Sequence, residues 1–329
     1  MKKELAPIIE EIQGRNILVI GDMVADIYLD GRISRISREA PVLVLEQAGE
    51  KVVAGGAANV VNNVATLGGN VFAVGLLGLD NAAKGLKAAL EANGANTTGL
   101  FCDEKRPTIS KTRVIAGGRA TVSQQIVRID KESKAPMPPA FEAELMQYLK
   151  QLLPNVQGVV ISDYGSGTVT PKIQQQLIQW CRHHEIPSIV DSRYDIHQFR
   201  NIGYVKQNDA ELAAAVGREL STEEDIFEAG QQLLQELSAD GVLVTRGEDG
   251  MVLLEKNGAI HNIPVSDKSE VFDVSGAGDT CVATVILALA AGVEPSTAAE
   301  LSNIASGIAV RKLGTATVSA EELRRAVKK

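Results

Sequence analysis

Residues 272–280 place small side chains and a carboxylate at the start of a predicted apolar helix. The residues that lead into this apolar run, 281–292, are Gly276, Ala277 and Gly278. Such a junction exposes backbone N–H groups at a helix N-terminus, where anions bind. Asp279 lies in the first turn and is a candidate proton acceptor. An alcohol phosphotransferase needs hydrogen-bond donors to the phosphoryl group beside a base. An Asp at this position also complements the helix dipole, which is the structural alternative.

Two further polar groups follow predicted strands nearer the N-terminus. Gly55 and Gly56 precede a helix predicted at 57–67, and glycines let a ligand approach the backbone closely. Asn59 offers both a donor and an acceptor to a hydroxylated ligand, although a simple turn explains the motif equally well. Asp22 and Asp26 follow the strand predicted at 16–20, and their carboxylates suit paired sugar hydroxyls. The alternatives are a loop turn and a solvated strand position.

Two more segments could face a nucleotide. Asn208 begins a helix and Glu211 follows three residues later, a spacing that predicts either a capping box or organisation of Mg²⁺ and water near phosphates. Residues 245–250 follow a strand predicted at 241–244 and contain Thr245 and Gly247. A hairpin connection explains this segment, and beside the Gly276 loop it becomes a candidate edge of a triphosphate site.

The composition narrows the classes of function. A chain of 329 residues suits one large α/β domain, and a net charge of −8 argues against nucleic-acid or anionic-membrane surfaces. The three cysteines are far apart in the sequence and lack metal-ligand spacing. This pattern predicts free thiols and a cytoplasmic location. The N-terminus does not resemble a signal peptide, and no apolar run is long enough for a membrane span.

The predicted elements alternate between strand and helix. Strands at 71–75, 158–161, 188–191 and 241–245 are interleaved with helices, which predicts a mainly parallel, doubly wound sheet with helices on both faces. Short strands such as 26–29 and 42–45 instead suggest a small separate sheet, built from about 25–53 and 108–129 with a turn at Gly117-Gly118. Ligands in such folds bind at the carboxyl ends of the strands, where all these motifs fall.

Together these residues resemble the ribokinase/PfkB family of sugar kinases. Residues 55–59 match its first signature, 273–279 its second, and 208–211 its Asn-x-x-Glu motif, in the family's order along essentially the whole chain. No P-loop and no dinucleotide-binding fingerprint occurs. Within the family, residues 34–42 and 312–319 resemble the heptose-7-phosphate kinases.

The resemblance implies a single ribokinase-like domain over residues 1–329, with the small sheet acting as a lid. It implies ATP and Mg²⁺, the latter near Glu211 through water, with a monovalent cation as a further option. Asp279 would be the base, and the N–H groups of Gly276, Ala277 and Gly278 would bind the moving phosphoryl group. Asn303 would lie near adenine. The sugar would contact Asp22, Asp26, Gly55, Gly56, Asn59 and Asp163, and its own phosphate would contact Arg35, Arg119 and Arg193.

The family's lids often pair between protomers, so the resemblance also implies a homodimer joined by the lid strands. The expected acceptor is D-glycero-β-D-manno-heptose 7-phosphate, phosphorylated at O1. Departures from the subgroup bear on this acceptor, because Asp191-Ser192-Arg193 replaces Asp-Pro-Lys, and Gln207 replaces a common Pro. Without the fused nucleotidyltransferase motif of many relatives, we expect a stand-alone kinase. The alternatives are a kinase for ribose, a fructose phosphate or a nucleoside, and a non-catalytic sugar or nucleotide sensor.

Overall fold

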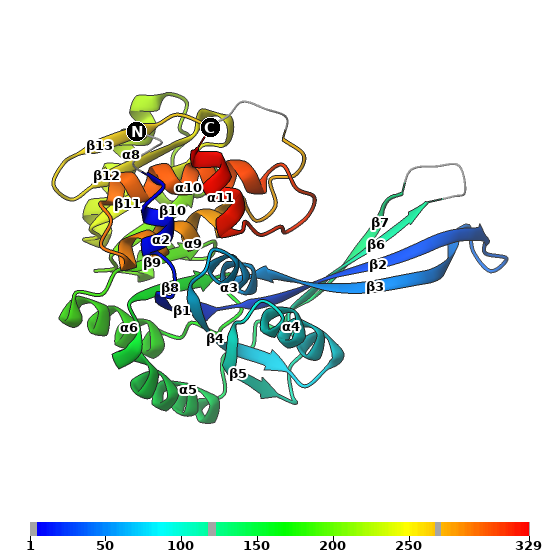
Figure 1. Ribbon diagram of the computed structural model, residues 1–329. Coiled ribbons are helices and arrows are strands. Elements are labelled where there is room, and N and C mark those ends of the chain that lie inside the picture. The colour runs from blue at the N-terminus through cyan, green and yellow to red at the C-terminus, as the bar shows by residue number, and fades with distance from the viewer. Residues whose placement is uncertain (1–4, 118–122, 267–270, 329) are drawn as a thin grey trace.

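The computed structural model describes residues 5–117, 123–266 and 271–328. Its main body is a nine-stranded sheet with the order β13-β12-β11-β10-β9-β8-β1-β4-β5 (Figure 1). Its strands are β1 (Asn16–Gly21), β4 (Asn70–Gly78), β5 (Asn96–Asp103), β8 (Gly158–Asp163), β9 (Ser188–Ser192), β10 (Tyr204–Asn208), β11 (Gly241–Thr245), β12 (Met251–Glu255) and β13 (Ile260–Ile263). The pairs are parallel except β11–β12 and β12–β13, which are antiparallel; β12 and β13 form a hairpin around Gly258.

Helices cover both faces of this sheet, as predicted (Figure 1). The α-helices are α2 (Ile8–Glu11), α3 (Ala57–Thr66), α4 (Asn81–Glu91), α5 (Pro139–Leu152), α6 (Pro171–His184), α7 (Asp209–Val216), α8 (Glu223–Leu237), α9 (Ala277–Ala290), α10 (Pro295–Ala309) and α11 (Ala320–Val327). Short 3₁₀ turns are η1 (Leu153–Asn155), η2 (Ile196–Gln198) and η3 (Gly247–Asp249).

Alternation along the buried strand β1 divides the core into two layers. Ile17 and Val19 pack in one hydrophobic cluster with α3, α9 and α10, whereas Leu18 and Ile20 pack in the other with α5, α6 and α8. Because successive side chains of a strand point to opposite faces, a strand covered on both faces must be apolar throughout. This double burial makes the carboxyl edge of the sheet a rigid platform for loops.

A second sheet of four strands projects from the main body (Figure 1). Its order is β3-β2-β6-β7, from β2 (Met23–Ile36), β3 (Leu43–Gly56), β6 (Ser110–Gly117) and β7 (Gln124–Lys131). The predicted small sheet is therefore confirmed, although the predicted turn at Gly117-Gly118 reaches beyond the described residues.

The predicted short strands at 26–29 and 42–45 are wrong in length. They belong to two strands of 14 residues each. These strands stay paired through irregularities in their register, one of which lies between Asp30 and Gly31. Polar and glycine positions that resemble strand ends in the sequence are thus accommodated by bulges inside one long ribbon.

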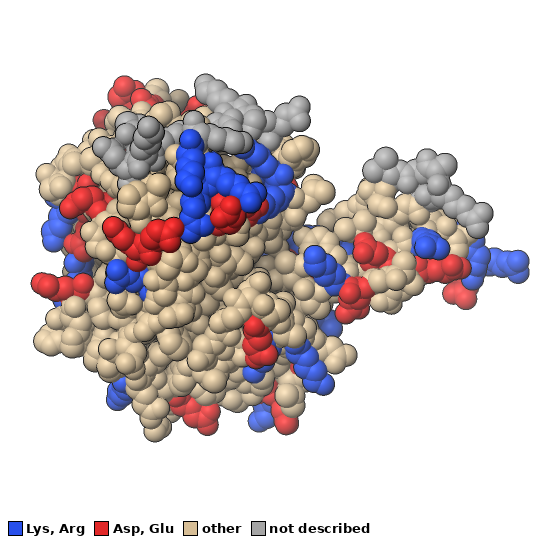
Figure 2. Space-filling view, viewed as in Figure 1, with Lys and Arg blue, Asp and Glu red and all other residues tan. Residues whose placement is uncertain are grey.

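Charged side chains of both signs are interspersed on the face drawn in Figure 2, over the main body and the lid alike. Among the residues that the structure describes, no helix is long and apolar enough to cross a membrane.

Candidate active site

The second signature forms the start of α9. Gly276 is the N-cap residue with φ of +81°, a left-handed conformation that suits glycine. Among the described residues, the N–H groups of Gly276, Gly278 and Asp279 have no hydrogen-bond acceptor, whereas Ala277 N–H donates to the Val274 carbonyl at 3.3 Å. We call these three free groups the candidate anion pocket; Ala277, predicted as a donor, is already engaged.

Asp279 is buried in the first turn of α9, with 5% of its surface exposed. Its Oδ2 accepts a hydrogen bond of 2.7 Å from Nδ2 of Asn59 on α3. Burial is the main cause that raises the pKa of Asp279 to about 6, while Asn59, Arg193 and Lys206 act in the opposite direction. A carboxylate with this pKa can accept a proton near neutral pH.

The glycines of the first signature permit close contact between β3 and β2. Gly56 has φ of +54°, and a Cβ atom there would lie 2.9 Å from the Asp22 carbonyl oxygen. A Cβ on Gly55 would lie 2.6 Å from Oδ2 of Asp26. Both positions require glycine for packing. The chain continues from them into α3, on which Asn59 contacts Asp279. The structural alternative thus explains why these positions are glycine, and their predicted contact with the sugar stays a prediction.

Asp22 supports a loop instead of facing an open cleft. Its carboxylate accepts N–H groups from Tyr164 at 2.9 Å, Ser166 at 3.0 Å and Thr168 at 3.3 Å. The residue has no exposed surface. The geometry therefore disfavours the predicted contact with sugar hydroxyls, because both oxygens are occupied by the loop after β8. Asp22 positions that loop.

Asp26 is engaged on the lid. Its Oδ1 accepts a bond of 2.7 Å from Nη1 of Arg113 on β6, and the guanidinium lies 5.4 Å from the centroid of the Tyr28 ring. The carboxylate is almost buried, with 5% of its side chain exposed. Its oxygen Oδ2 accepts no hydrogen bond among the described side chains, so Asp26 retains one oxygen for a sugar hydroxyl.

Asp163 and Arg193 lie at the ends of β8 and β9. Asp163 accepts the Gly165 N–H at 2.9 Å and the Ser192 hydroxyl at 2.8 Å, and burial raises its pKa. The Arg193 guanidinium carbon lies 5.0 Å from the centre of the Tyr164 ring. Arg193 is near enough to Asp279 to lower its pKa, and both residues remain candidates for the sugar side.

The other two arginines predicted for the sugar phosphate do not join this group. Arg35 is exposed near the far end of β2, at the part of the lid that lies away from the main body (Figure 1). Arg119 falls outside the described residues. Within the described part of one protomer, Arg193 is therefore the one predicted arginine that reaches the site.

On the nucleotide side, the capping interpretation of the Asn-x-x-Glu motif is confirmed. Asn208 caps α7 through the Glu211 N–H at 2.7 Å, and Glu211 Oε2 accepts the Asn208 N–H at 2.8 Å. Glu211 also lies 3.4 Å from Nε of Arg193. The described residues contain no group of three or more His, Cys, Asp or Glu side chains that could hold a metal ion. The expected Mg²⁺ near Glu211, held through water, stays a prediction.

The other residues predicted for the nucleotide side are Thr245, Gly247 and Asn303. Thr245 ends β11, and its hydroxyl lies 3.5 Å from the Gln207 carbonyl oxygen. Gly247 has φ of +56° and open space where a Cβ would lie. Asn303 on α10 donates a bond of 2.7 Å to the Pro264 carbonyl. Thr245 thus contacts the end of β10, Gly247 has room beside it, and Asn303 supports the segment after β13.

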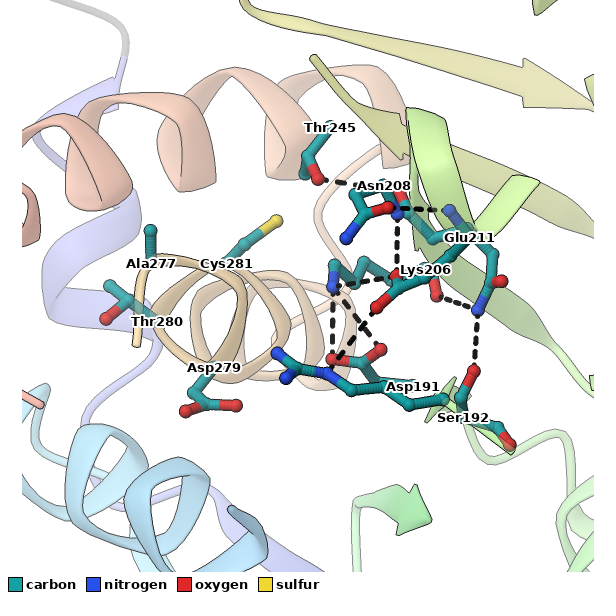
Figure 3. Close-up of polar contacts among 12 residues, drawn as sticks. Asp191, Ser192, Lys206, Asn208, Glu211, Thr245, Ala277, Asp279, Thr280 and Cys281 are labelled. Atoms are coloured by element: carbon teal, nitrogen blue, oxygen red, sulfur yellow. Dashed lines mark hydrogen bonds and ion pairs between the residues drawn. The ribbon is translucent and has the colours of Figure 1, made fainter. Parts of the chain in front are cut away.

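Sequence reasoning missed a buried ion pair beneath the anion pocket. The Lys206 ammonium on β10 lies 3.1 Å from an oxygen of Asp191 on β9, and their side chains are 2% and 4% exposed. Figure 3 shows this pair beside the first turn of α9. The available signal was a charged residue inside each of two neighbouring buried strands, at positions that pair with each other.

Comparison with known proteins agrees with this geometry. The model of the pfkB family carbohydrate kinases matches residues 15–323. The chain belongs to this family. It is therefore a carbohydrate kinase, as the resemblance in its sequence implied, with the family's two signatures joined in space through Asn59 and Asp279.

Curated relatives match nearly the whole of this chain. It is 39% identical over 323 residues to the bifunctional protein HldE of Geobacter metallireducens, covering 98% of this chain and 65% of the relative. It is also 39% identical to the protein of the same name from Geobacter sulfurreducens, covering 94% of this chain and 62% of that one. The chain thus spans slightly less than two thirds of these relatives.

Solved structures confirm the ribokinase-like fold of this family member. Arabidopsis thaliana ribokinase, complexed with ribose and ATP, superposes with a TM-score of 0.74 at 19% identity, covering 96% of this chain and 99% of that one. Phosphofructokinase-2 from Escherichia coli, in complex with potassium, gives a TM-score of 0.75 at 20% identity, covering 96% and 98%.

Proposed function

We propose that this chain transfers the γ-phosphoryl group of ATP to a hydroxyl of a sugar phosphate. The observation that carries the proposal is the contact between the two signatures, in which Asn59 holds one oxygen of Asp279 beside the free N–H groups of Gly276 and Gly278. A base and an oxyanion pocket thus share one turn of helix. Phosphoryl transfer relies mainly on positioning and electrostatics, and both are supplied here by rigid elements.

In the proposed reaction, the acceptor oxygen attacks the γ-phosphorus and the bond to the β-phosphate oxygen breaks. The hydroxyl proton passes to the free oxygen of Asp279, and ADP leaves. The N–H groups of Gly276, Gly278 and Asp279 stabilise the negative charge on the transferring group, each worth roughly 3 kcal/mol if it behaves as other oxyanion donors do. Mg²⁺, when bound, supplies charge neutralisation at the phosphates, and Glu211 would orient its water.

The acceptor that we propose is D-glycero-β-D-manno-heptose 7-phosphate, phosphorylated at O1 to give the 1,7-bisphosphate. Support comes from the similarity of 34–42 and 312–319 to heptose-7-phosphate kinases and from the relatives named HldE. Arg193, beside Tyr164 and close to Asp163, is the cation of the described site that would meet an acceptor phosphate. The lid would close over the sugar and exclude water, which competes as acceptor.

We also propose that the chain forms a homodimer through the lid and works in the cytoplasm. Several large apolar side chains of the lid are exposed, namely Ile36, Val42, Leu43, Val127 and Ile129. A thin sheet with apolar side chains in water is a surface that a partner would cover. Arg35 lies on the same distal part of the lid, so a second protomer could bring it to an acceptor site. The three cysteines are free thiols, as expected in a reducing compartment.

An assay of ADP release tests the acceptor. Heptose 7-phosphate, fructose 6-phosphate and ribose would be compared at equal concentrations, with ³¹P NMR to locate the new phosphate. We expect the highest kcat/KM for heptose 7-phosphate. A higher value for fructose 6-phosphate or ribose would move the assignment to another sugar kinase. Binding of ATP without turnover of any sugar would favour the sensor alternative, for which the intact base and pocket give no reason.

A further inference from the structure

Lys206 is a charged side chain in the interior of the protein. Its ammonium donates to both oxygens of Asp191, at 3.1 and 3.3 Å, and lies 3.7 Å from Oε2 of Glu211. Burial opposes its charge, but Asp191 and Glu211 together raise its pKa, so it remains an ammonium ion. Removing a lysine from water is costly, and a hydrophobic residue of similar volume would often serve stability as well. Stability alone is therefore a weak reason for this residue.

The ammonium lies directly against the turn of α9 that forms the anion pocket. A Cβ atom on Gly278 would lie 2.9 Å from Nζ of Lys206 and 4.0 Å from Oδ2 of Asp191. Figure 3 shows Lys206 between Asp191 and Glu211, next to the turn that carries Asp279. At the position of Gly278, the Lys206 ammonium is therefore closer to the turn than the Asp191 carboxylate is.

The local balance of charge explains why this order matters. Three carboxylates lie in this part of the site, those of Asp191, Glu211 and Asp279. Lys206 contacts the first two, Arg193 contacts Glu211, and both cations lower the pKa of Asp279. A nucleotide with a terminal phosphate adds negative charge at this point. Without Lys206, the uncompensated carboxylates would repel that phosphate in a site of low effective dielectric.

We propose that Lys206 is a positioning residue for the terminal phosphate of the nucleotide: it supports the first turn of α9 and compensates Asp191 and Glu211, so that the site binds a nucleoside triphosphate in preference to a diphosphate. The inference rests on the kinase activity of the family and not on the identity of the sugar. It concerns a residue outside both signatures.

Two variants with opposite expected effects test this role. Lys206→Met removes the charge at similar volume, and Asp191→Asn removes the nearest carboxylate and leaves the ammonium beside Glu211. The affinities of the non-hydrolysable analogue AMP-PNP and of ADP, each with Mg²⁺, would be measured by calorimetry without any sugar. Lys87→Met is the matched control, because Lys87 on α4 donates to the Leu100 carbonyl on β5, outside the site. Thermal melting would check the fold of each variant.

We expect K206M to lower the preference for AMP-PNP over ADP by about tenfold, a modest effect for a unit charge at this range. D191N should raise the same preference, and K87M should leave it unchanged. If Lys206 merely held the fold together, K206M and D191N would both break one buried pair and would weaken both nucleotides alike, which would overturn the proposal. Should K206M fail to fold, a preference in D191N equal to or below that of the wild type overturns it as well. The proposed sugar can fail in the ADP-release assay without affecting these binding results.

Discussion

Nδ2 of Asn59 lies 2.7 Å from Oδ2 of Asp279, although the two residues are 220 positions apart in the sequence. The bond joins the first turns of α3 and α9, which are packed together in the same hydrophobic layer. It holds one carboxylate oxygen and orients the side chain. No other hydrogen bond to Asp279 oxygens occurs within the described ranges, so the second oxygen is available to an acceptor hydroxyl.

Replacement of the proposed base should separate chemistry from binding. In Asp279→Asn, kcat should fall by about 10²–10⁴, because the amide cannot accept the proton. The KM for ATP and the melting temperature should change little. Steady-state kinetics and calorimetry would check this, with Asp30→Asn on the exposed part of β2 as a control of the same chemical change. Near-normal turnover in D279N would remove Asp279 from the mechanism.

The wild-type enzyme should lose activity in acid. Burial raises the pKa of Asp279 from the ordinary 3.8 to about 6, and only the ionised carboxylate accepts the hydroxyl proton. The kcat/KM for the sugar should therefore increase with pH and level off above this value. A pH–rate profile measured in overlapping buffers would show this rise, the acidic limb of the profile. A profile that is flat across about pH 5–7 would contradict the role of a buried base.

Loss of the amide that holds this base should move the same limb. In Asn59→Leu, the carboxylate loses the hydrogen bond that favours its charged form, so the pKa of Asp279 should rise and the limb should shift to higher pH. Asn62→Leu alters the same helix without touching Asp279 and serves as the control, since Asn62 accepts a bond from Asn93. An unchanged limb in N59L would show that the contact has no effect on the base.

The glycine at the start of α9 should matter for activity beyond its effect on stability. Gly276 has φ of +81°, and a Cβ there would lie 2.6 Å from Nδ2 of Asn59. Gly292, past the other end of the same helix, has φ of +82° and no atom within 4 Å of its Cβ position. G276A and G292A should both lose about 1 kcal/mol of stability through strain.

Only G276A should also lose kcat, by at least about tenfold, because its Cβ displaces Asn59 and the pocket N–H groups. Denaturant unfolding and steady-state kinetics on the same preparations would separate the two effects. Equal kcat in G276A and G292A would mean that the conformation of the pocket tolerates a side chain.

Charges on the lid should break the proposed dimer. Val127 and Ile129 on β7 are 47% and 52% exposed. The double variant V127K/I129K should elute and scatter light as a monomer at concentrations where the wild type is a dimer, because lysine ammonium groups cannot be buried unpaired. Ile260→Lys on β13, where Ile260 is 45% exposed, should leave the association state unchanged. A monomeric wild type would refute the dimer.

Much of the fold could be predicted from local pattern. The strand at 241–245 has the predicted bounds, because apolar patterning acts over a few residues. Strand β5, between Asn96 and Asp103, was not predicted, since polar residues occupy its start and only pairing with β4 makes it a strand. The length of β2 and β3 likewise depends on their pairing with each other.

The sequence by itself determined the family and the chemistry, because the signature residues carry the helix start, the small side chains and the acid within one short segment. Only the tertiary structure decided which oxygen of Asp279 is held, that Asp22 supports a loop, and that Lys206 lies beneath the pocket. The physical reason is that hydrogen bonding, burial and charge compensation depend on distances between residues remote in the chain. A local pattern places each residue on its element, and packing of the elements decides what it contacts.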